Sequence, residues 1–346
     1  MKYEAPTTDD RHIWDLFLTS TYVISIVAAD DAGIFASLNE NPASIEGLAQ
    51  TLDFDIRATT ALLRQLTSLG FLYQHDNFYQ LTDQARLYLI KSSPFYWGNM
   101  MRVGVNIDQR DRIIEKLKTK DSLDLQGIPT HEATNPTHGW ATGNISMEQA
   151  IMIAAAMHSH SMPAAVGLAR NYDLTGIRSI LDVGGGSGCF MIAMAQLNPA
   201  LKCTIMDLNT MCEVAVSYIK SGRVYGQVDT IAVNMFREEW PNGYDALFFS
   251  NIFHDWSFKT CEWLAQRAYN ALPDGGRIML HEMLLNDDGA GSITPSSFSL
   301  MMLLCTQGQQ FTFGELKAIL EKVGFIDIQV RPTAGYYSIT TGYKKK

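Results

Sequence analysis

A short apolar segment followed by an acid and a run of glycines constrains the fold most, over residues 179–188 (SILDVGGGSG). Ile180, Leu181 and Val183 are side chains typical of a strand that is covered on both faces. The glycines allow a tight turn and let a ligand approach the backbone closely. Residues 190–197 continue at helical spacing, so amide groups at a helix N-terminus would face that ligand. The segment therefore predicts a buried strand, a ligand-binding turn and a helix in an α/β protein.

The spacing of the glycines discriminates between ligands. In the dinucleotide-binding pattern the third glycine would fall on Cys189 or Met191, and no Gly-Lys-Ser/Thr follows as a phosphate loop requires. The pattern of an acid followed by three alternate glycines instead resembles the first motif of S-adenosylmethionine-dependent methyltransferases. Because that cofactor carries an amino-acid end, the carboxylate of Asp182 suits its ammonium group.

Length and charge narrow the class of protein. The 346 residues are enough for about two domains, and the formal net charge of −9 disfavours nucleic acid and anionic membranes as partners. No uninterrupted apolar run reaches the ~18 residues of a membrane span, and the first ten residues are too polar for a secretory signal. The five scattered cysteines indicate reduced core thiols and a cytoplasmic protein.

The N-terminal third reads as helical and then as a winged helix. Residues 14–38 predict one or two buried helices with a break at Gly33, and residues 41–89 predict two helices followed by two short strands. The second of these helices offers only Arg57 and Arg64 as cations, whereas a DNA reader should present a basic stripe. A dimerisation or lid role is therefore favoured over DNA binding. Further on, we expect a helix from Met147 that is broken at Pro163.

After the glycine turn, strands and helices alternate, which predicts a parallel sheet built from βα units. The expected strands lie at residues 202–207, 245–250 and 278–283, and residues 230–236 are expected to form a further strand and the turn that faces the adenine. Ligands of such sheets bind beyond the carboxyl ends of the strands. Five polar side chains fall there: Asp182, Asp207, Asn234, His254 and Glu282.

The order of these motifs is similar to that of the small-molecule O-methyltransferases with an N-terminal winged-helix dimerisation domain, a family of plant phenolic, hydroxyindole and bacterial natural-product enzymes. The segments that carry the resemblance are LDVGGGSG (181–188), MDL (206–208), FHDW (253–256), PDGGR (273–277) and EM (282–283). The resemblance implies a Rossmann-like, seven-stranded methyltransferase sheet, mostly parallel with the last strand antiparallel. It also implies a winged-helix dimerisation domain over residues 1–100, a helical connector and site roof over 101–165, a cofactor-binding domain over 166–346, and a homodimer.

The resemblance further implies S-adenosylmethionine as methyl donor and S-adenosylhomocysteine as product. The general base would be His254, oriented by Glu282, and Asp207 would bind the ribose. The full set of expected cofactor residues is Asp182, Gly184, Gly186, Asp207, Leu208, Asn234, Met235 and Ser250.

Four positions depart from the family pattern. Asn234 stands where an aspartate usually faces the adenine, and Ser250 replaces a lysine four residues before the base. His281 replaces an aliphatic residue, and Gln310 lies where a second acid often flanks the base. The last change leaves the orientation of the base less firmly specified.

Several apolar, sulfur-containing and polar side chains are candidates for a pocket that takes a flat ring: Trp140, Met157, His160, Asp255, Trp256, Phe298, Met301 and Met302. Histidines and acids at 254, 255, 281 and 282 could in principle bind a metal. Adjacent residues of a strand point to opposite faces, however, so His281 and Glu282 cannot easily share an ion, and we expect no metal.

Three functions remain open from the sequence. The first is an O-methyltransferase that acts on a hydroxyl of a small, aromatic metabolite. The second is the same scaffold methylating carbon or nitrogen, or binding the cofactor without methyl transfer. The third is a ligand-sensing regulator that uses the winged helix, which the acidic net charge disfavours.

Overall fold

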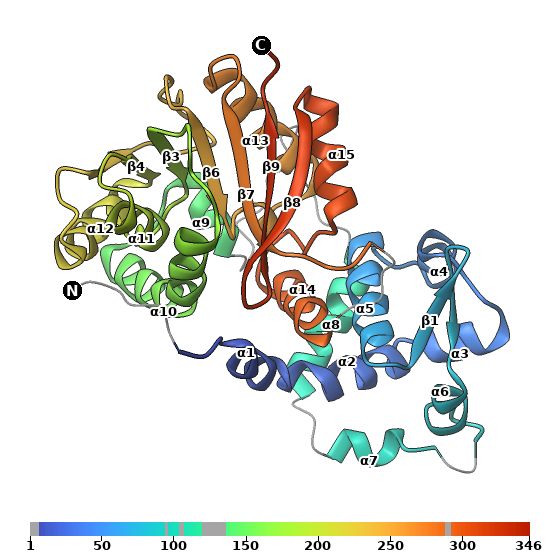
Figure 1. Cartoon of the computed structure of the whole chain (residues 1–346). Coiled ribbons are helices and arrows are strands. Elements are labelled where there is room, and N and C mark those ends of the chain that lie inside the picture. Colours follow the sequence, from blue (N-terminus) through green and yellow to red (C-terminus); the bar gives the residue numbers. More distant parts are fainter. Residues whose placement is uncertain (1–6, 94–95, 104–106, 120–135, 288–291) are drawn as a thin grey trace. The chain divides into compact units, whose positions relative to one another are not determined.

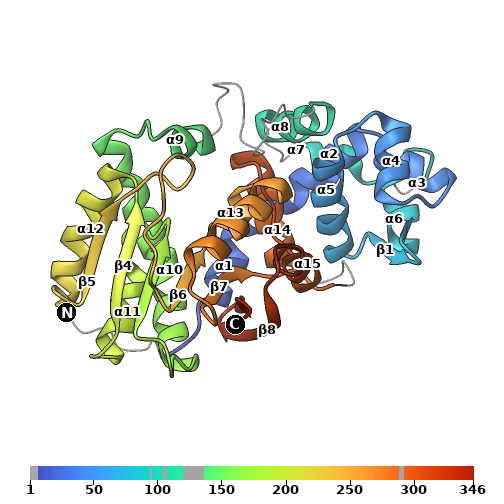
Figure 2. The same ribbon diagram turned by 90° about the horizontal axis from the view of Figure 1, so that it is seen from above.

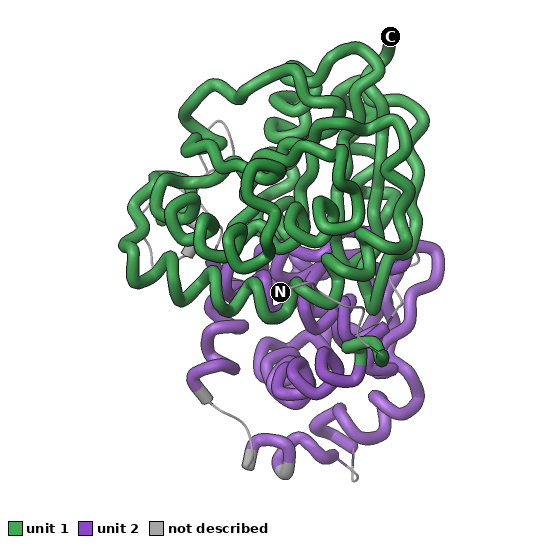
Figure 3. The backbone as a smooth tube through the Cα atoms, turned by 60° about the vertical axis from the view of Figure 1, so that its left-hand side comes forward, with its two compact units in different colours: residues 1–11, 124–284, 313–346 green, residues 12–123, 285–312 purple. Residues whose placement is uncertain are grey.

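The structure is a computed structural model that describes residues 7–93, 96–103, 107–119, 136–287 and 292–346. Its contacts divide the chain into two compact units, which Figure 3 colours separately. Unit 1 comprises residues 1–11, 124–284 and 313–346, and unit 2 comprises residues 12–123 and 285–312.

Unit 1 is built on a seven-stranded sheet with the strand order β5-β4-β3-β6-β7-β9-β8 (Figure 1). Its strands are β3 (Ser179–Val183), β4 (Lys202–Asp207), β5 (Val228–Ala232), β6 (Ala246–Ser250), β7 (Arg277–Met283), β8 (Ile326–Ala334) and β9 (Tyr337–Tyr343). The first five are parallel, and β9 pairs antiparallel with both β7 and β8. The predicted fold class, with its antiparallel last strand, is confirmed.

Helices cover both faces of this sheet, as Figure 2 shows from above. They are α9 (Pro136–Thr142), α10 (Met147–Asn171), α11 (Cys189–Leu197), α12 (Asn209–Gly222), α13 (Phe258–Ala271) and α15 (Phe313–Val323), with a short 3-10 helix η1 at Phe253–Asp255. Alternation along β6 separates the faces. Phe248 packs on Phe190 of α11 at a centroid distance of 5.4 Å, whereas its neighbour Phe249 packs on Phe253 of η1 at 5.4 Å.

Helix α10 runs without interruption through Pro163, so the expected break at that residue is wrong. A proline inside a helix removes one backbone hydrogen bond and crowds the preceding turn. Here the helix is held at its start by a capping box, in which the side chains of Ser146 and Gln149 each accept a hydrogen bond from the other residue's backbone. It also packs along α11 and α12. Tertiary packing therefore outweighs the local cost of the proline.

Unit 2 is mostly helical and carries one hairpin. Its elements are α1 (Arg11–Leu18), α2 (Ser20–Asp31), α3 (Ile34–Glu40), α4 (Ile45–Leu52), α5 (Ile56–Ser68), β1 (Leu72–His75), β2 (Phe78–Leu81), α6 (Asp83–Tyr88), α7 (Gly98–Val103), α8 (Ile107–Lys118) and α14 (Ile293–Cys305). Ser44, Asp55 and Thr82 cap α4, α5 and α6 through their side chains. The hairpin turns at Asp76 and Asn77, which both have positive φ. These elements match the predicted winged helix.

Helix α14 groups with unit 2 rather than with the sheet. Leu300 and Leu303 belong to the same buried cluster as Leu62, Leu63 and Leu66 of α5. The amide of Gln65 in α5 also donates to the hydroxyl of Ser297 at 3.0 Å. The sequence placed residues 166–346 in one domain because strand and helix signals do not reveal a partner that is distant in the chain. Residues 104–106 and 120–135 of the expected connector lie outside the described residues.

By length and mean hydropathy alone, two helical stretches could cross a membrane, Arg11–Asp31 and Met147–Asn171. The first consists of two helices, α1 and α2, with Thr19 between them, and the second packs along α11 and α12. Core helices with these contacts pass the same test, so the criterion does not by itself indicate a membrane protein.

Candidate active site

The glycine turn joins β3 to α11 as the sequence predicts. Gly184 and Gly188 have φ values of 71° and 74°, in the left-handed region that favours glycine. A Cβ on Gly184 would lie 2.5 Å from Cδ1 of Ile252, and one on Gly188 would lie 2.2 Å from Cδ1 of Ile205. Both positions therefore require glycine for conformation, and any side chain there would also displace an isoleucine.

Two carboxylates flank this turn at the tips of neighbouring strands. Asp182 is only 2 % exposed, and its Oδ2 accepts no hydrogen bond. Burial, and then the nearby charge of Asp207, raise the pKa of Asp182 well above its usual value. Asp207 accepts hydrogen bonds from the amides of Gly186 (2.8 Å) and Leu208 (2.7 Å). Burial nevertheless raises the pKa of Asp207 to about 6.

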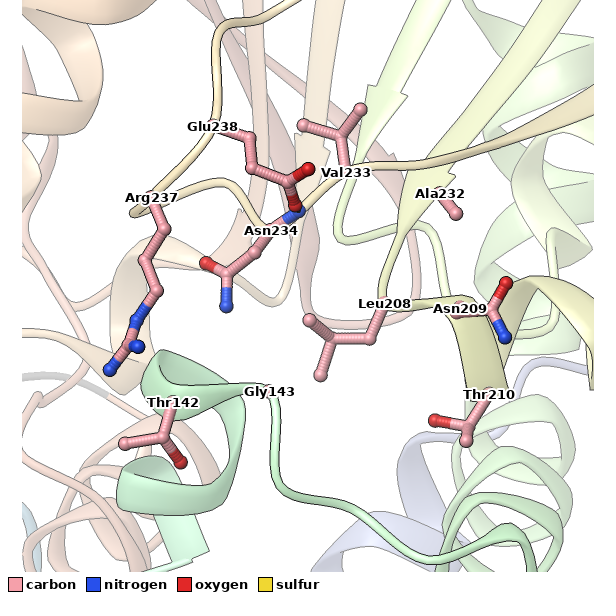
Figure 4. Close-up of a pocket in the computed structure, with 10 residues that line it drawn as sticks. All are labelled: Thr142, Gly143, Leu208, Asn209, Thr210, Ala232, Val233, Asn234, Arg237 and Glu238. Carbon is pink, nitrogen blue, oxygen red and sulfur yellow. The ribbon is translucent and has the colours of Figure 1, made fainter.

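A cavity of about 480 Å³ opens beside Asp207, beyond the ends of β4 and β5. Figure 4 shows the side chains that line it: Thr142, Gly143, Leu208, Asn209, Thr210, Ala232, Val233, Asn234, Arg237 and Glu238. The side-chain amide of Asn234 already serves the backbone, since Oδ1 accepts from the amide of Phe236 at 2.9 Å and Nδ2 donates to the carbonyl of Ala141 at 3.2 Å. Strand β5 ends at Ala232, and the turn that the segment 230–236 was expected to include follows it.

The residue at position 250 is engaged by His281. The hydroxyl of Ser250 lies 3.0 Å from Nδ1 of His281, and the hydroxyl of Thr333 lies 2.9 Å from Nε2. The ring of His281 is fully buried and stacked on Tyr337 at 5.0 Å. Burial lowers the pKa of His281 to about 3, so this histidine is a neutral structural residue. Two of the departures from the family pattern thus form one polar contact.

The candidate base lies on η1, next to β7. Nδ1 of His254 is 3.1 Å from Oε2 of Glu282, and His254 is 4 % exposed. The other carboxylate oxygen, Oε1, accepts hydrogen bonds from the amides of Ile252 (3.1 Å) and Phe253 (3.0 Å). A single carboxylate therefore holds the backbone of the base-bearing segment by two hydrogen bonds through Oε1, and its Oε2 lies beside one nitrogen of the imidazole.

Asp255 and His160, two of the expected substrate residues, lie near the imidazole of His254. Oδ1 of Asp255 lies 3.7 Å from Nε2 of His254, and burial raises the pKa of Asp255 to about 6. His160 on α10 is close enough to feel the charge of His254. Burial, with this charge as a smaller cause, lowers the pKa of His160 to about 4. Nε2 of His160 lies 3.3 Å from the sulfur of Met157, whose side chain is partly exposed.

The remaining expected substrate residues are divided between the two units. Trp256 is buried against Phe236, and Trp140 packs on the cluster between α10 and α12. Phe298, Met301 and Met302 lie on α14 in unit 2, where Phe298 packs on Trp14 at a centroid distance of 5.2 Å. Among the described residues, no three His, Cys, Asp or Glu side chains are arranged to hold a metal ion.

Two polar contacts that support the site were not predicted from the sequence. The thiol of Cys261 on α13 donates to the carbonyl of Phe253 at 3.2 Å. Nδ1 of His158 on α10 lies 2.9 Å from the hydroxyl of Ser187 in the glycine turn. Neither contact has a signal in the sequence, because each depends on how a helix packs against another segment, 8 residues away for Cys261 and 29 for His158.

Comparisons with known proteins agree with this arrangement. Residues 128–326 match the O-methyltransferase domain, and residues 14–91 match the O-methyltransferase dimerisation domain. The chain is 29 % identical over 311 residues to a 3-hydroxy-5-methyl-1-naphthoate 3-O-methyltransferase of Streptomyces sahachiroi, which covers 88 % of this chain and 86 % of that protein.

Two further similarities concern a different chemistry and the fold. The chain is 26 % identical over 330 residues to an L-tyrosine C(3)-methyltransferase of Streptomyces lavendulae, covering 93 % of this chain and 88 % of that protein. The crystal structure of an O-methyltransferase family 2 protein from Planctomyces limnophilus, in complex with apigenin, covers 99 % of this chain and 100 % of its own, with a TM-score of 0.83 and 24 % identity. From the family models, which span most of its length, we conclude that this chain belongs to the O-methyltransferase family, whose methyl donor is S-adenosylmethionine.

Proposed function

We propose that this enzyme transfers the methyl group of S-adenosylmethionine to a hydroxyl of a small aromatic acceptor, with His254 as general base and Glu282 as its orienting carboxylate. One observation carries the proposal: Nδ1 of His254 lies 3.1 Å from Oε2 of Glu282. A carboxylate there fixes the proton on Nδ1, so Nε2, on the opposite side of the ring, can accept a proton.

The residues around the glycine turn fit the cofactor. The orphaned, buried Oδ2 of Asp182 suits the ammonium group, because an unpaired buried acceptor gains most from a cationic donor. Each carboxylate oxygen of Asp207 holds one backbone amide and retains a lone pair for a ribose hydroxyl. Leu208 and Asn234 line the adjoining cavity, where we place the adenine, next to Met235. When bound, the cofactor supplies an electrophilic methyl group on a sulfonium sulfur.

The chemistry left to the protein is deprotonation, positioning and exclusion of water. A phenol has a pKa near 10 and is mostly protonated at neutral pH, so removal of its proton by Nε2 of His254 assists attack on the methyl carbon. Glu282 then stabilises the imidazolium that forms. Because His254 is almost fully buried, this charge pair acts in a low-dielectric environment, where it is worth more than in water.

Charges near the base favour a neutral acceptor. Asp255 and Glu282 are both acids, and His160 is held neutral by a pKa of about 4. A hydroxylated ring without a carboxylate would avoid repulsion, and Met157 with its partly exposed thioether would contact it.

A second chemistry is favoured by one relative. The L-tyrosine C(3)-methyltransferase of Streptomyces lavendulae methylates a ring carbon according to its name, and the same base could deprotonate a phenol to activate its ring. Product analysis separates the two, because O-methylation removes the phenolic hydroxyl and C-methylation retains it.

We also propose that the enzyme is a cytoplasmic homodimer. The dimerisation domain model over residues 14–91 supports the dimer, and the exposed apolar side chains of Ile13, Leu16 and Phe17 on α1 offer a surface for it. The five free cysteines, four of them buried, agree with a reducing compartment.

The proposal is tested by binding and by turnover measured separately. Titration calorimetry should detect S-adenosylhomocysteine binding to the wild type and to H254A with similar affinity. A screen of phenols, amines and C-nucleophiles should identify an acceptor, and H254A should lose about 10²–10⁴-fold in kcat. H75A is the matched control, since His75 is an exposed hairpin residue. An H254A enzyme with wild-type kcat would remove the assigned role.

A further inference from the structure

The base-bearing segment starts at a residue with an unusual backbone conformation. Asn251 has φ of +55° and lies between β6 and η1. The other non-glycine residues with positive φ among the described ones have ordinary local roles. Asp53 and Arg223 end helices, Asp76 and Asn77 form the hairpin turn, and Asp327 lies at an irregularity of β8. Only Asn251 adjoins the candidate catalytic residues.

This conformation redirects the chain at the tip of the strand. The amide of Asn251 donates to the carbonyl of His281 at 3.2 Å, which extends the pairing of β6 with β7 by one residue. Ile252 then adopts a right-handed helical conformation, with φ of −113° and ψ of −50°. When a left-handed residue is followed by a right-handed one, the backbone N–H groups of neighbouring residues point toward one place. They form a concave site for an anion.

The anion in this concave site is Glu282. Its Oε1 accepts from both Ile252 and Phe253, at 3.1 and 3.0 Å, while Oε2 faces Nδ1 of His254. The position of the carboxylate relative to the imidazole thus depends on where these two amides point. They point to Glu282 only because the preceding residue is left-handed.

We propose that Asn251 is a positioning residue of the methyl transfer, which sets the geometry of the His254–Glu282 pair through its left-handed backbone; this rests on the proposed role of His254. The side chain of Asn251 also makes a hydrogen bond with Tyr337, and because N251G and N251A both remove this contact, a comparison of the two variants isolates the backbone conformation. Asparagine tolerates the left-handed region, glycine adopts it without strain, and β-branched residues are outliers there.

If the backbone conformation of residue 251 matters, kcat of its variants should follow how readily each residue becomes left-handed. Side-chain size and polarity do not predict the same order. We expect kcat of N251G and N251D to stay within about threefold of the wild type, N251A to fall several-fold, and N251V to fall 10- to 100-fold. The affinity for S-adenosylhomocysteine should change less than twofold in all four. An N251V variant that does not fold is replaced in the comparison by N251A, whose strain is smaller.

A spectroscopic measurement separates positioning from general damage. Nitrogen-15 NMR of His254 should show the proton on Nδ1 in the wild type and N251G, and a mixture of tautomers in N251V. The proposal is overturned if N251G loses as much kcat as N251A, or if the losses appear only in cofactor affinity. Failure of the proposed function looks different: H254A would remain active, whatever Asn251 variants do.

Discussion

Substitution of Glu282 by glutamine reverses one hydrogen-bonding direction while preserving shape. The remaining carbonyl oxygen can still accept from the amides of Ile252 and Phe253, as Oε1 does now. The new NH₂ group then faces Nδ1 of His254, 3.1 Å from the present Oε2. Because an amide nitrogen only donates, Nδ1 must accept, and the imidazole proton moves to Nε2. The nitrogen that should remove the acceptor's proton is then already protonated.

Two estimates give the size of the effect. Two unit charges 3.1 Å apart interact with about 5 kcal/mol at an effective dielectric constant of ~20, and this attraction to the imidazolium is lost. Loss of a general base typically costs about 10²–10⁴-fold in rate, which corresponds to roughly 3–5 kcal/mol. We therefore expect E282Q to lose about 10²–10⁴-fold in kcat.

The assay is single-turnover methyl transfer with the acceptor from the screen, together with calorimetric binding of S-adenosylhomocysteine. E262Q is the control, because Glu262 on α13 pairs only with Lys322 at the surface among the described side chains. The loss in E282Q should shrink with acceptors of lower pKa, which ionise without a base. Unchanged kcat in a folded E282Q, or an equal loss for a phenol that is ionised in solution, would refute the reasoning.

Three further outcomes follow from burial and exposure. Burial lowers the pKa of His281 to about 3, so below pH 6.5 the unfolded state binds more protons than the folded state. The free energy of unfolding should therefore fall by about 2 kcal/mol at pH 5, and urea unfolding of H281Q should lack this loss. Burial raises the pKa of Asp207 to about 6, and its protonated form accepts fewer hydrogen bonds; the Kd of S-adenosylhomocysteine should therefore rise about tenfold from pH 7 to pH 5, with a smaller rise for D207N. Phe17 is 59 % exposed, so F17D should dissociate the proposed dimer in sedimentation velocity and change Tm little.

The candidate site divides into parts that the sequence reveals and parts that it does not. The sequence brings Asp182, Asp207, His254 and Glu282 together because each lies in or just after the last residues of a strand with a clear apolar signal, and the ends of parallel strands meet at one edge. The contact between Ser250 and His281 was not foreseen, although both positions were noticed as departures. Register between β6 and β7 decides it, and register depends on the whole sheet.

Helix predictions succeeded where the signal is local and failed where packing dominates. Gly33 separates α2 from α3 as expected, because a left-handed glycine ends a helix regardless of its surroundings. Pro163 does not break α10, because contacts along α11 and α12 compensate for the lost hydrogen bond.

By itself, the sequence determined the order of strands and helices, the glycine turn and the acids at two strand tips. These features depend on apolar periodicity and on backbone preferences of single residues, which act over a few positions. Only the tertiary structure decided that α14 packs with α5, that Glu282 also accepts from the amides of Ile252 and Phe253, and that Ser250 contacts His281. Such contacts join residues tens to hundreds of positions apart, and their geometry is set by sheet register and side-chain packing, which no local pattern encodes.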